Sequence, residues 1–226
     1  MADPVRPYGG VSAEQRRARR RAALLEAALD VLAAEGAAGV TVRGVCGRAR
    51  LNDRYFYESF ADRDEVLLAL VDELFTNGAT IVVEVLDGQP ADARAQARAV
   101  ISAVVAFLDE DPRRGRLLLE SQATEALQRR RHDAVRLLAT IVTNRAQELL
   151  GAAAPSRVDT ELGAITLVSG CLELLAAWLR GELEVTREHL TDFLVAMILT
   201  ASDLSAALER EVRGGAEHAG PAEATR

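Results

Sequence analysis

The sequence contains few of the residues that build disulfide frameworks, metal sites or β-sheets. Its two cysteines, Cys46 and Cys171, lie far apart, so they form neither a disulfide framework nor a zinc-binding spacing. His132 and His189 have no partner at a ligand spacing, and we expect no metal. Six prolines, and the lack of any long alternating run of apolar and polar residues, argue against a β-sheet fold.

Long uncharged apolar runs are absent as well. No stretch reaches the roughly 18 uncharged apolar residues that a membrane span requires. Near the N-terminus, arginines precede a charged amphipathic segment, where a signal peptide would have its apolar core. We therefore expect a cytoplasmic protein that has no membrane partner.

Signatures of catalysis are also missing. The chain has no Gly-rich phosphate loop, no nucleophile elbow, no histidine cluster at metal-ligand spacing and no E-x-x-H pair. We expect neither catalytic residues nor a cofactor, and we do not expect an enzyme.

The residues that are abundant favour helices. Hydrophobic residues make up 49% of the chain and are mainly Ala and Leu, which lose little side-chain freedom in a helix. The charge is uneven, because residues 1–63 hold 11 Arg against 8 acidic residues whereas the remainder holds 16 Arg against 26. A basic N-terminal third on an acidic body predicts one local phosphate-binding face.

The N-terminal third begins with an arm and one long helix. Residues 1–12 contain two prolines and two glycines and are expected to be flexible. A helix of about 20 residues follows, with apolar residues from Leu24 to Leu32 on one face, and Gly36 and Gly39 end it.

Two very short helices come next. Thr41 can cap the first, which runs to about Ala49, and Asn52 can cap the second. Only Arg50 and Leu51 remain for the turn between them. Two helices of under ten residues joined so tightly form a helix-turn-helix unit.

Longer amphipathic helices fill the rest of the sequence. A D-x-x-E capping box at Asp62 opens the first of them, and prolines at 112 and 155 mark clear breaks. We place these helices near 63–79, 92–110, 113–150 with a break near Thr124, 157–181 and 187–211.

One spaced set of residues within Leu24–Leu70 is specific. It comprises Leu24-Leu25-x-Ala-Ala-Leu-x-Val-Leu-Ala-x-x-Gly36, Thr41-Val42-Arg43-x-Val45, Ala49 and Tyr55-Phe56-Tyr57-x-x-Phe60-x-x-Arg63-Asp64-x-x-Leu67. This pattern resembles the DNA-binding domain of the TetR family of bacterial transcriptional regulators. The resemblance implies an all-α chain with a three-helix DNA-binding domain containing a helix-turn-helix, followed by a helical bundle. The implied segments are a flexible arm at 1–12, the DNA-binding domain at 13–62, a ligand-binding and dimerisation domain at 63–212 and a disordered tail at 213–226.

The second short helix, residues 53–59, is called the recognition helix below. Its two faces follow from the sequence without the family resemblance. Phe56 and Phe60 are four residues apart and are expected to face the first helix, which leaves Arg54, Tyr57 and Glu58 on the opposite face. Exposed tyrosine beside arginine suits a helix in the major groove, where Tyr reaches phosphates and Arg hydrogen-bonds guanine.

The resemblance adds expected contacts with the DNA backbone at three positions, only one of which is on this helix. In the family, the residues matched by Thr41, Tyr57 and Arg63 contact the DNA backbone. Together the pattern and the resemblance predict DNA-binding residues at Arg17, Arg20, Thr41, Arg43, Asn52, Asp53, Arg54, Tyr55, Tyr57 and Arg63.

The match departs from the family pattern at the turn and on the recognition helix. Arg50 stands where the family usually has Gly, so a left-handed conformation there is less comfortable. Asp53 stands where Lys is common, and Glu58 adds a second acid. Such carboxylates can accept from cytosine N4, and they would add specificity while lowering general affinity for DNA.

The resemblance fades after Leu70 but still suggests what the body does. The last two long helices resemble those with which the family forms homodimers, and two-fold symmetry implies double-stranded DNA with a palindromic operator as partner. A small-molecule effector that releases a repressor from this operator is implied too. Scarce aromatics beyond the DNA-binding domain favour an apolar, aliphatic or acyl effector. Candidate lining residues are Ile101, Val105, Leu108, Leu137, Leu138, Ile141, Leu167 and Cys171.

One alternative from another class stays open at this point. Tyr55, Phe56 and Tyr57 could instead belong to a helical protein-interaction module without sequence-specific DNA binding. Duplex binding with a steep salt dependence distinguishes the first function from this one.

Overall fold

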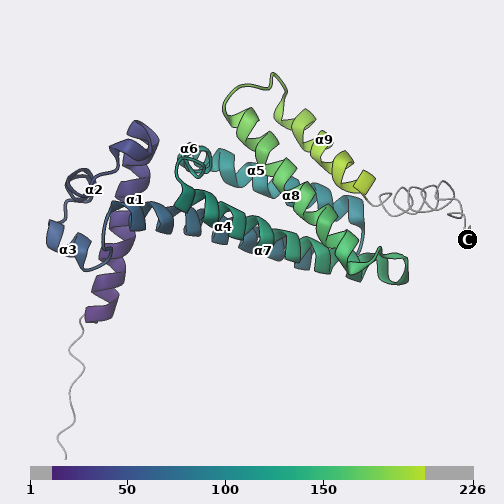
Figure 1. Ribbon diagram of the computed structural model, residues 1–226, viewed down its shortest axis with the longest axis horizontal. Helices are drawn as coiled ribbons and strands as arrows, with labels where there is room; N and C mark the ends of the chain where they lie inside the picture. The colour runs from purple at the N-terminus through teal and green to yellow at the C-terminus, as the bar shows by residue number, and fades with distance from the viewer. Residues whose placement is uncertain (1–11, 202–226) are drawn as a thin grey trace, which may run out of the picture. The chain divides into compact units, whose positions relative to one another are not determined.

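A computed structural model describes residues 12–201, and every regular element within that range is a helix (Figure 1). The elements are α1 (Ala13–Gly39), α2 (Val42–Ala49), α3 (Asp53–Tyr57), α4 (Arg63–Gly88), α5 (Ala93–Glu110), α6 (Pro112–Glu120), α7 (Glu125–Leu150), the 3-10 helix η1 (Gly151–Ala153), α8 (Arg157–Leu179) and α9 (Arg187–Thr200). The predicted all-α class is confirmed. The arm expected before residue 12, the tail expected at 213–226 and the end of the last expected helix lie outside the described residues.

These helices form two compact units. The first comprises the described residues up to 74 together with 112–131, and the second comprises 75–111 and 132–201. The chain passes from one unit to the other inside α4 and inside α7. By packing, α6 and the start of α4 group with the N-terminal helices, whereas the sequence placed a domain boundary after residue 62.

The first unit begins with a capped helix. The Ser12 hydroxyl accepts from the Gln15 amide at 3.0 Å, and the Gln15 side chain accepts from the Ser12 amide at 3.0 Å, which completes a capping box. Gly36 has φ 74°, a left-handed conformation that breaks α1 before its last short turn. Of the two glycines expected to end the helix, Gly39 is its last residue and Gly36 marks a kink before it.

The helix-turn-helix forms as its caps predict. Thr41 Oγ1 accepts from the Gly44 amide at 3.1 Å and begins α2, and Asn52 Oδ1 accepts from the Arg54 amide at 2.9 Å and begins α3. Arg50 between them adopts φ 54° and ψ 41°, so it takes the left-handed position. Its amide donates to α2 carbonyls, which ends that helix.

Apolar residues from several helices close the core of the first unit. Leu24, Ala28 and Leu32 are four residues apart on α1 and are fully buried. Phe56 and Phe60 are also buried and lie with ring centroids 5.7 Å apart. Burial of each large side chain contributes on the order of 1.5–3 kcal/mol, so this face of α1 organises the unit. Further buried members are Val40, Val45, Val66, Leu67, Leu70, Leu117 and Leu118.

The second unit pairs α9 with α5 and α8 (Figure 1). Val105 of α5 and Leu194 of α9 are both fully buried. Arg98 lies 2.6 Å from Asp192, so an ion pair also joins α5 to α9. A bend after α8 is closed by Gly181, whose φ is 74°.

The end of α4 differs from the one expected, whereas the next predicted break is found. Helix α4 continues to Gly88, beyond the predicted end at 79, because the buried side chains of Ala79 and Val82 keep the segment packed. The break expected near Thr124 is confirmed between α6 and α7.

Two of the helices are apolar enough to cross a membrane by length and composition alone. The relevant 18-residue windows of α4 and α8 have mean hydropathy 1.7 and 1.8. Acidic residues still interrupt both helices, Asp72 and Glu73 in α4 and Glu161 and Glu173 in α8, in keeping with the lack of a strictly uncharged run. The window of α4 is 39% buried and that of α8 only 17%, so α8 keeps most of its apolar surface open on this chain.

Candidate nucleic-acid interface

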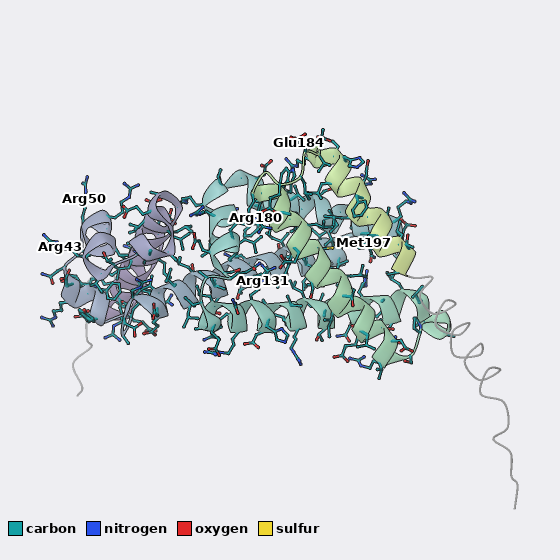
Figure 2. All side chains as sticks on the ribbon, turned by 45° about the horizontal axis from the view of Figure 1, so that its top comes forward. Arg43, Arg50, Arg131, Arg180, Glu184 and Met197 are labelled. Atoms are coloured by element: carbon teal, nitrogen blue, oxygen red, sulfur yellow. The ribbon has the colours of Figure 1, made fainter. Side chains whose placement is uncertain are left out.

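The outer side of α2, the turn and α3 is the exposed face of the helix-turn-helix. Thr41, Arg43 and Arg50 are all exposed, and Figure 2 shows Arg43 and Arg50 at the edge of the first unit with side chains directed away from the ribbon. On α3, the Arg54 side chain is 84% exposed and Tyr57 is 61% exposed. Two arginines and a tyrosine on adjacent short helices are groups that bind phosphates and base edges.

The buried side of α3 explains this exposure. Phe56 is fully buried and packs edge-on against Tyr57, with ring centroids 5.5 Å apart. Because Phe56 fixes the inward side of the helix, Arg54 and Tyr57 are held outward, as the periodicity predicted. The buried Phe56 ring therefore supports the Tyr57 ring and restricts its movement.

The recognition helix carries its acid Glu58 in an internal network. Glu58 Oε1 accepts from Arg54 Nε at 3.2 Å, and Oε2 accepts from Arg20 Nη2 of α1 at 3.4 Å. The Arg20 guanidinium also lies 4.5 Å from the ring centroid of Tyr55, a cation–π contact. The Glu58 carboxylate thus pairs with two of the arginines that were predicted to bind DNA. This pairing was not predicted from the sequence.

The second acid, Asp53, lies beside the thiol of Cys46 in α2. Burial of that thiol and its hydrogen bond with the Asp53 carboxylate raise the pKa of Cys46 to about 11. The thiol is therefore protonated at neutral pH and serves as a donor. Both acids that set this recognition helix apart from the family pattern have donors within the first unit.

Other predicted DNA-binding residues have structural partners as well. The side-chain oxygen of Asn52 caps α3. Arg63 Nη2 donates to the Ala37 carbonyl at 3.2 Å, and its Nε lies 3.3 Å from Asp64, so Arg63 ties the start of α4 to the end of α1. Arg17 lies exposed on the early turns of α1.

Arg50 is a candidate contact that the sequence analysis treated only as a departure from the family. It is the one described non-glycine residue with positive φ, and its side chain is exposed at the edge of the first unit, as is that of Arg43 (Figure 2). A left-handed backbone at an exposed arginine between the two short helices makes this residue a candidate for function. The sequence held that signal, because Arg stands where Gly is usual.

The candidate effector residues fall into three groups. Three from α5 are buried and four from α7 and α8 are half-buried, whereas Leu137 is 53% exposed. Burial raises the pKa of Cys171, one of the half-buried residues, to about 11. The buried group is Ile101, Val105 and Leu108, and the half-buried group is Leu138, Ile141, Leu167 and Cys171.

An open hollow in the second unit lies elsewhere. It has a volume of about 350 Å³ and is lined by polar side chains of α5 and α9. None of the eight predicted apolar residues lines it. The lining residues are Arg98, Ser102, Arg187, Glu188, Thr191 and Asp192. Within residues 12–201, no group of three or more His, Cys, Asp or Glu is placed to hold a metal ion.

The comparisons with known proteins identify the class of this fold. Residues 24–70 match the family model of the bacterial regulatory proteins of the tetR family. The resemblance drawn from the sequence is therefore confirmed for the segment that carries it. Comparison with curated proteins found no match.

Solved structures extend the likeness across most of the chain. The TetR-like transcriptional regulator from Rhodococcus sp. RHA1 has a TM-score of 0.61 at 18% identity and covers 80% of this chain and 93% of its own. The fatty acid degradation regulator FadR from Bacillus halodurans has a TM-score of 0.64 at 14% identity, with coverage of 82% and 93%. The transcriptional regulator FadR from Bacillus subtilis, in complex with stearoyl-CoA, has a TM-score of 0.68 at 17% identity, with coverage of 80% and 98%. At these identities the likeness concerns the fold.

Residues 24–70 therefore form the N-terminal domain of a DNA-binding transcriptional regulator, and most of the chain shares the fold of solved TetR-like structures. In particular, the domain is that of the TetR family, and the exposed face of α2 and α3 is the part of it suited to DNA.

Proposed function

We propose that this chain is a transcriptional repressor that binds a palindromic operator as a homodimer and releases it when an apolar small molecule binds. The observation that carries the proposal is the exposed face of α2 and α3. There Arg43 of α2 and both Arg54 and Tyr57 of α3 are exposed, and the capped start of α2 lies two residues before Arg43. Amides at a helix N-terminus and arginine side chains both attract phosphate, and arginine can also distinguish guanine.

The short recognition helix supports a dimer. Helix α3 has five residues, so one copy can contact only a few base pairs. Two copies related by two-fold symmetry double the contacts and require a palindromic site.

The open apolar surface of α8 is suited to the second copy. Val158 is 66% exposed and Leu162 is 60% exposed, and Phe193 of α9 is exposed too. Exposed apolar side chains of this size favour association. Pairing with a second copy would also cover the apolar 18-residue stretch of α8 with protein, so that this stretch needs no membrane.

Two observations support an apolar effector, and one title among the similar structures agrees with them. The expected lining residues are aliphatic apart from Cys171, and aromatic residues are scarce in the second unit. The similar FadR from Bacillus subtilis was solved in complex with stearoyl-CoA. A long acyl chain is therefore the first effector class to test.

Selection and footprinting test operator binding directly. Duplexes are selected from a random library with the wild-type protein and footprinted, together with DNA upstream of the protein's own coding region. We expect protection of two half-sites about one helical turn apart and an affinity that falls steeply with salt. Arg54→Ala combined with Tyr57→Phe should abolish this binding, while Leu137→Ala should leave it intact. Absent or salt-insensitive binding would contradict the proposal and favour a protein-interaction module.

Sedimentation measures the dimer and the effector response separately. Leu162→Glu places a charge in the proposed interface and should convert the dimer to monomers, with a helical spectrum unchanged because the residue is exposed on one chain. Leu137→Glu is the matched control, since Leu137 is exposed outside α8. Stearoyl-CoA should release the wild-type protein from the selected duplex, whereas coenzyme A alone should not. If neither stearoyl-CoA nor coenzyme A releases the protein from the duplex, long acyl chains are excluded as effectors.

A further inference from the structure

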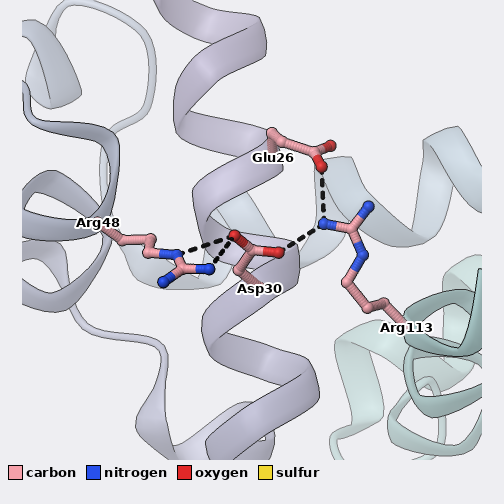
Figure 3. Close-up of polar contacts among 4 residues, drawn as sticks. All are labelled: Glu26, Asp30, Arg48 and Arg113. Carbon is pink, nitrogen blue, oxygen red and sulfur yellow. Dashed lines mark hydrogen bonds and ion pairs between the residues drawn. The ribbon is translucent and has the colours of Figure 1, made fainter.

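Asp30 in the middle of α1 holds one arginine from each of two other helices (Figure 3). Its Oδ2 accepts from Arg48 Nε of α2 at 2.9 Å and lies 2.8 Å from Nη2 of the same side chain. Its Oδ1 accepts from Arg113 Nη1 of α6 at 2.5 Å. All three helices belong to the first unit, and one carboxylate therefore links α2 to α6 through α1.

A second acid fixes the α6 end of this link. Arg113 Nη1 also donates to Glu26 Oε1 at 2.6 Å, and Glu26 lies one helical turn before Asp30 on α1. Figure 3 shows the Arg113 side chain reaching both acids from the side of α1 away from Arg48. The guanidinium thus bridges two carboxylates, and its position depends on both.

The environment makes these contacts stronger than ordinary surface ion pairs. The Asp30 side chain is 25% exposed and that of Arg113 is 30% exposed, so water screens the central pair only in part. The bonds from Arg48 and Arg113 hold the pKa of Asp30 below its ordinary value of 3.8. A lowered pKa means that the ionised, paired form is present at neutral pH and is lost only as the pH falls through the folded value.

One end of this link is next to the second unit in sequence, and the other end is on a helix of the candidate DNA face. Helix α6 begins at Pro112, directly after the segment of the second unit that contains α5, so Arg113 is the second residue after the chain enters the first unit. At the other end, Arg48 lies on α2, whose start carries Thr41 and Arg43 on the candidate DNA face. A shift of α6 along α1 would pull Arg113 from Asp30 and change how that carboxylate holds α2.

We propose that Asp30 is a positioning residue for DNA binding, which ties the orientation of α2 to the position of α6. The inference rests on DNA binding by the first unit, as proposed above, and assigns the internal contact that sets it. Asp30 does not touch DNA in this scheme. Asp30 acts on α2 through its contact with Arg48, and the contact with Arg113 determines where the Asp30 carboxylate lies.

A double-mutant cycle on Arg48 and Arg113 tests the link. The two arginines each contact Asp30, so their effects should couple through it. On the duplex selected with the wild-type protein, at fixed salt, we expect Arg113→Gln to weaken binding about threefold to tenfold, the range for one partly exposed charge pair. Arg48→Gln combined with Arg113→Gln should weaken binding less than the product of the two single effects. In an Asp30→Asn background, Arg113→Gln should have almost no further effect.

A matched control separates positioning from loss of charge. Arg129→Gln removes the same charge from the first unit, but Arg129 pairs with Glu125 of its own helix. It should change affinity less than about twofold, since exposed pairs of this kind contribute little. Equal effects of Arg113→Gln and Arg129→Gln, or multiplicative effects in the cycle, would overturn the proposal.

Hydrogen exchange supplies a readout that needs no DNA. Arg113→Gln should speed exchange of the α2 amides, residues 42–49, although Arg113 lies on α6, while Arg129→Gln should not. Unchanged α2 exchange in a folded Arg113→Gln protein would refute the link. If the wild-type protein binds no duplex, the proposed function fails, and the exchange data still decide the link. The cycle of the two arginines remains interpretable if Asp30→Asn does not fold.

Discussion

The two units differ in where their apolar surface goes. In the first unit, Phe56, Phe60 and one face of α1 are buried together, and the exposed side of α2 and α3 carries arginine and tyrosine. In the second unit, α5 and α9 bury a core, but α8 leaves Val158 and Leu162 exposed. The first unit buries its apolar residues within itself and exposes a face that suits a polar partner, whereas the second retains an apolar face that suits another protein surface.

The largest expected effect comes from opening the closed core. Phe56→Ala removes a fully buried ring and should lower the free energy of unfolding by about 3–5 kcal/mol, with loss of DNA binding. Leu137→Ala, an apolar truncation at a position that is 53% exposed, should change it by less than about 0.5 kcal/mol. Urea denaturation followed by circular dichroism measures both. Similar costs for the two variants would mean that the units do not differ in closure.

A smaller effect is expected when the paired acid of the recognition helix is neutralised. Glu58→Gln weakens the hold on Arg20 and Arg54, so affinity for duplex DNA should rise several-fold at low salt. The slope of log affinity against log salt should steepen by about one to two, the contribution of one or two added phosphate contacts. Fluorescence anisotropy across a salt series measures this. Glu125→Gln, which frees Arg129 on another helix, is the control, and an equal change in both variants would refute a special role for Glu58.

The smallest effect concerns the turn. Arg50→Gly relieves a left-handed arginine and should raise the free energy of unfolding by about 0.5–1 kcal/mol. The same change should weaken DNA binding, because a charge leaves the exposed face. Arg50→Lys should keep most of the binding without the gain in stability. Thermal melts measure the gain in stability and fluorescence anisotropy measures the loss of DNA binding. Unchanged binding by Arg50→Gly would show that Arg50 is not part of the interface.

Features set by neighbours in sequence were predictable. The caps at Thr41 and Asn52 and the inward face of Phe56 follow from local hydrogen bonding and helical periodicity. The box at Ser12 could have been found as well, because Gln15 follows it at the capping-box spacing.

Features set by distant residues were not predictable in the same way. Glu58 meets Arg20 across 38 positions, and Asp30 meets Arg113 across 83. Such pairs depend on how helices pack, and the spacing of charges along the chain does not encode it. The length of α4 was missed for a related reason, because burial at Ala79 and Val82 continues the helix past the expected end.

The pairing of Glu58 has a consequence for how such a protein would find its site in a genome. Non-operator DNA retains a regulator mainly through its phosphates, and each free arginine lengthens every unproductive stay. Arginines that are already engaged by a carboxylate gain less from a random phosphate than from an operator that offers base edges as well. The acid on the recognition helix would thus shorten the time lost on wrong sequences, and a weaker grip would become a faster search.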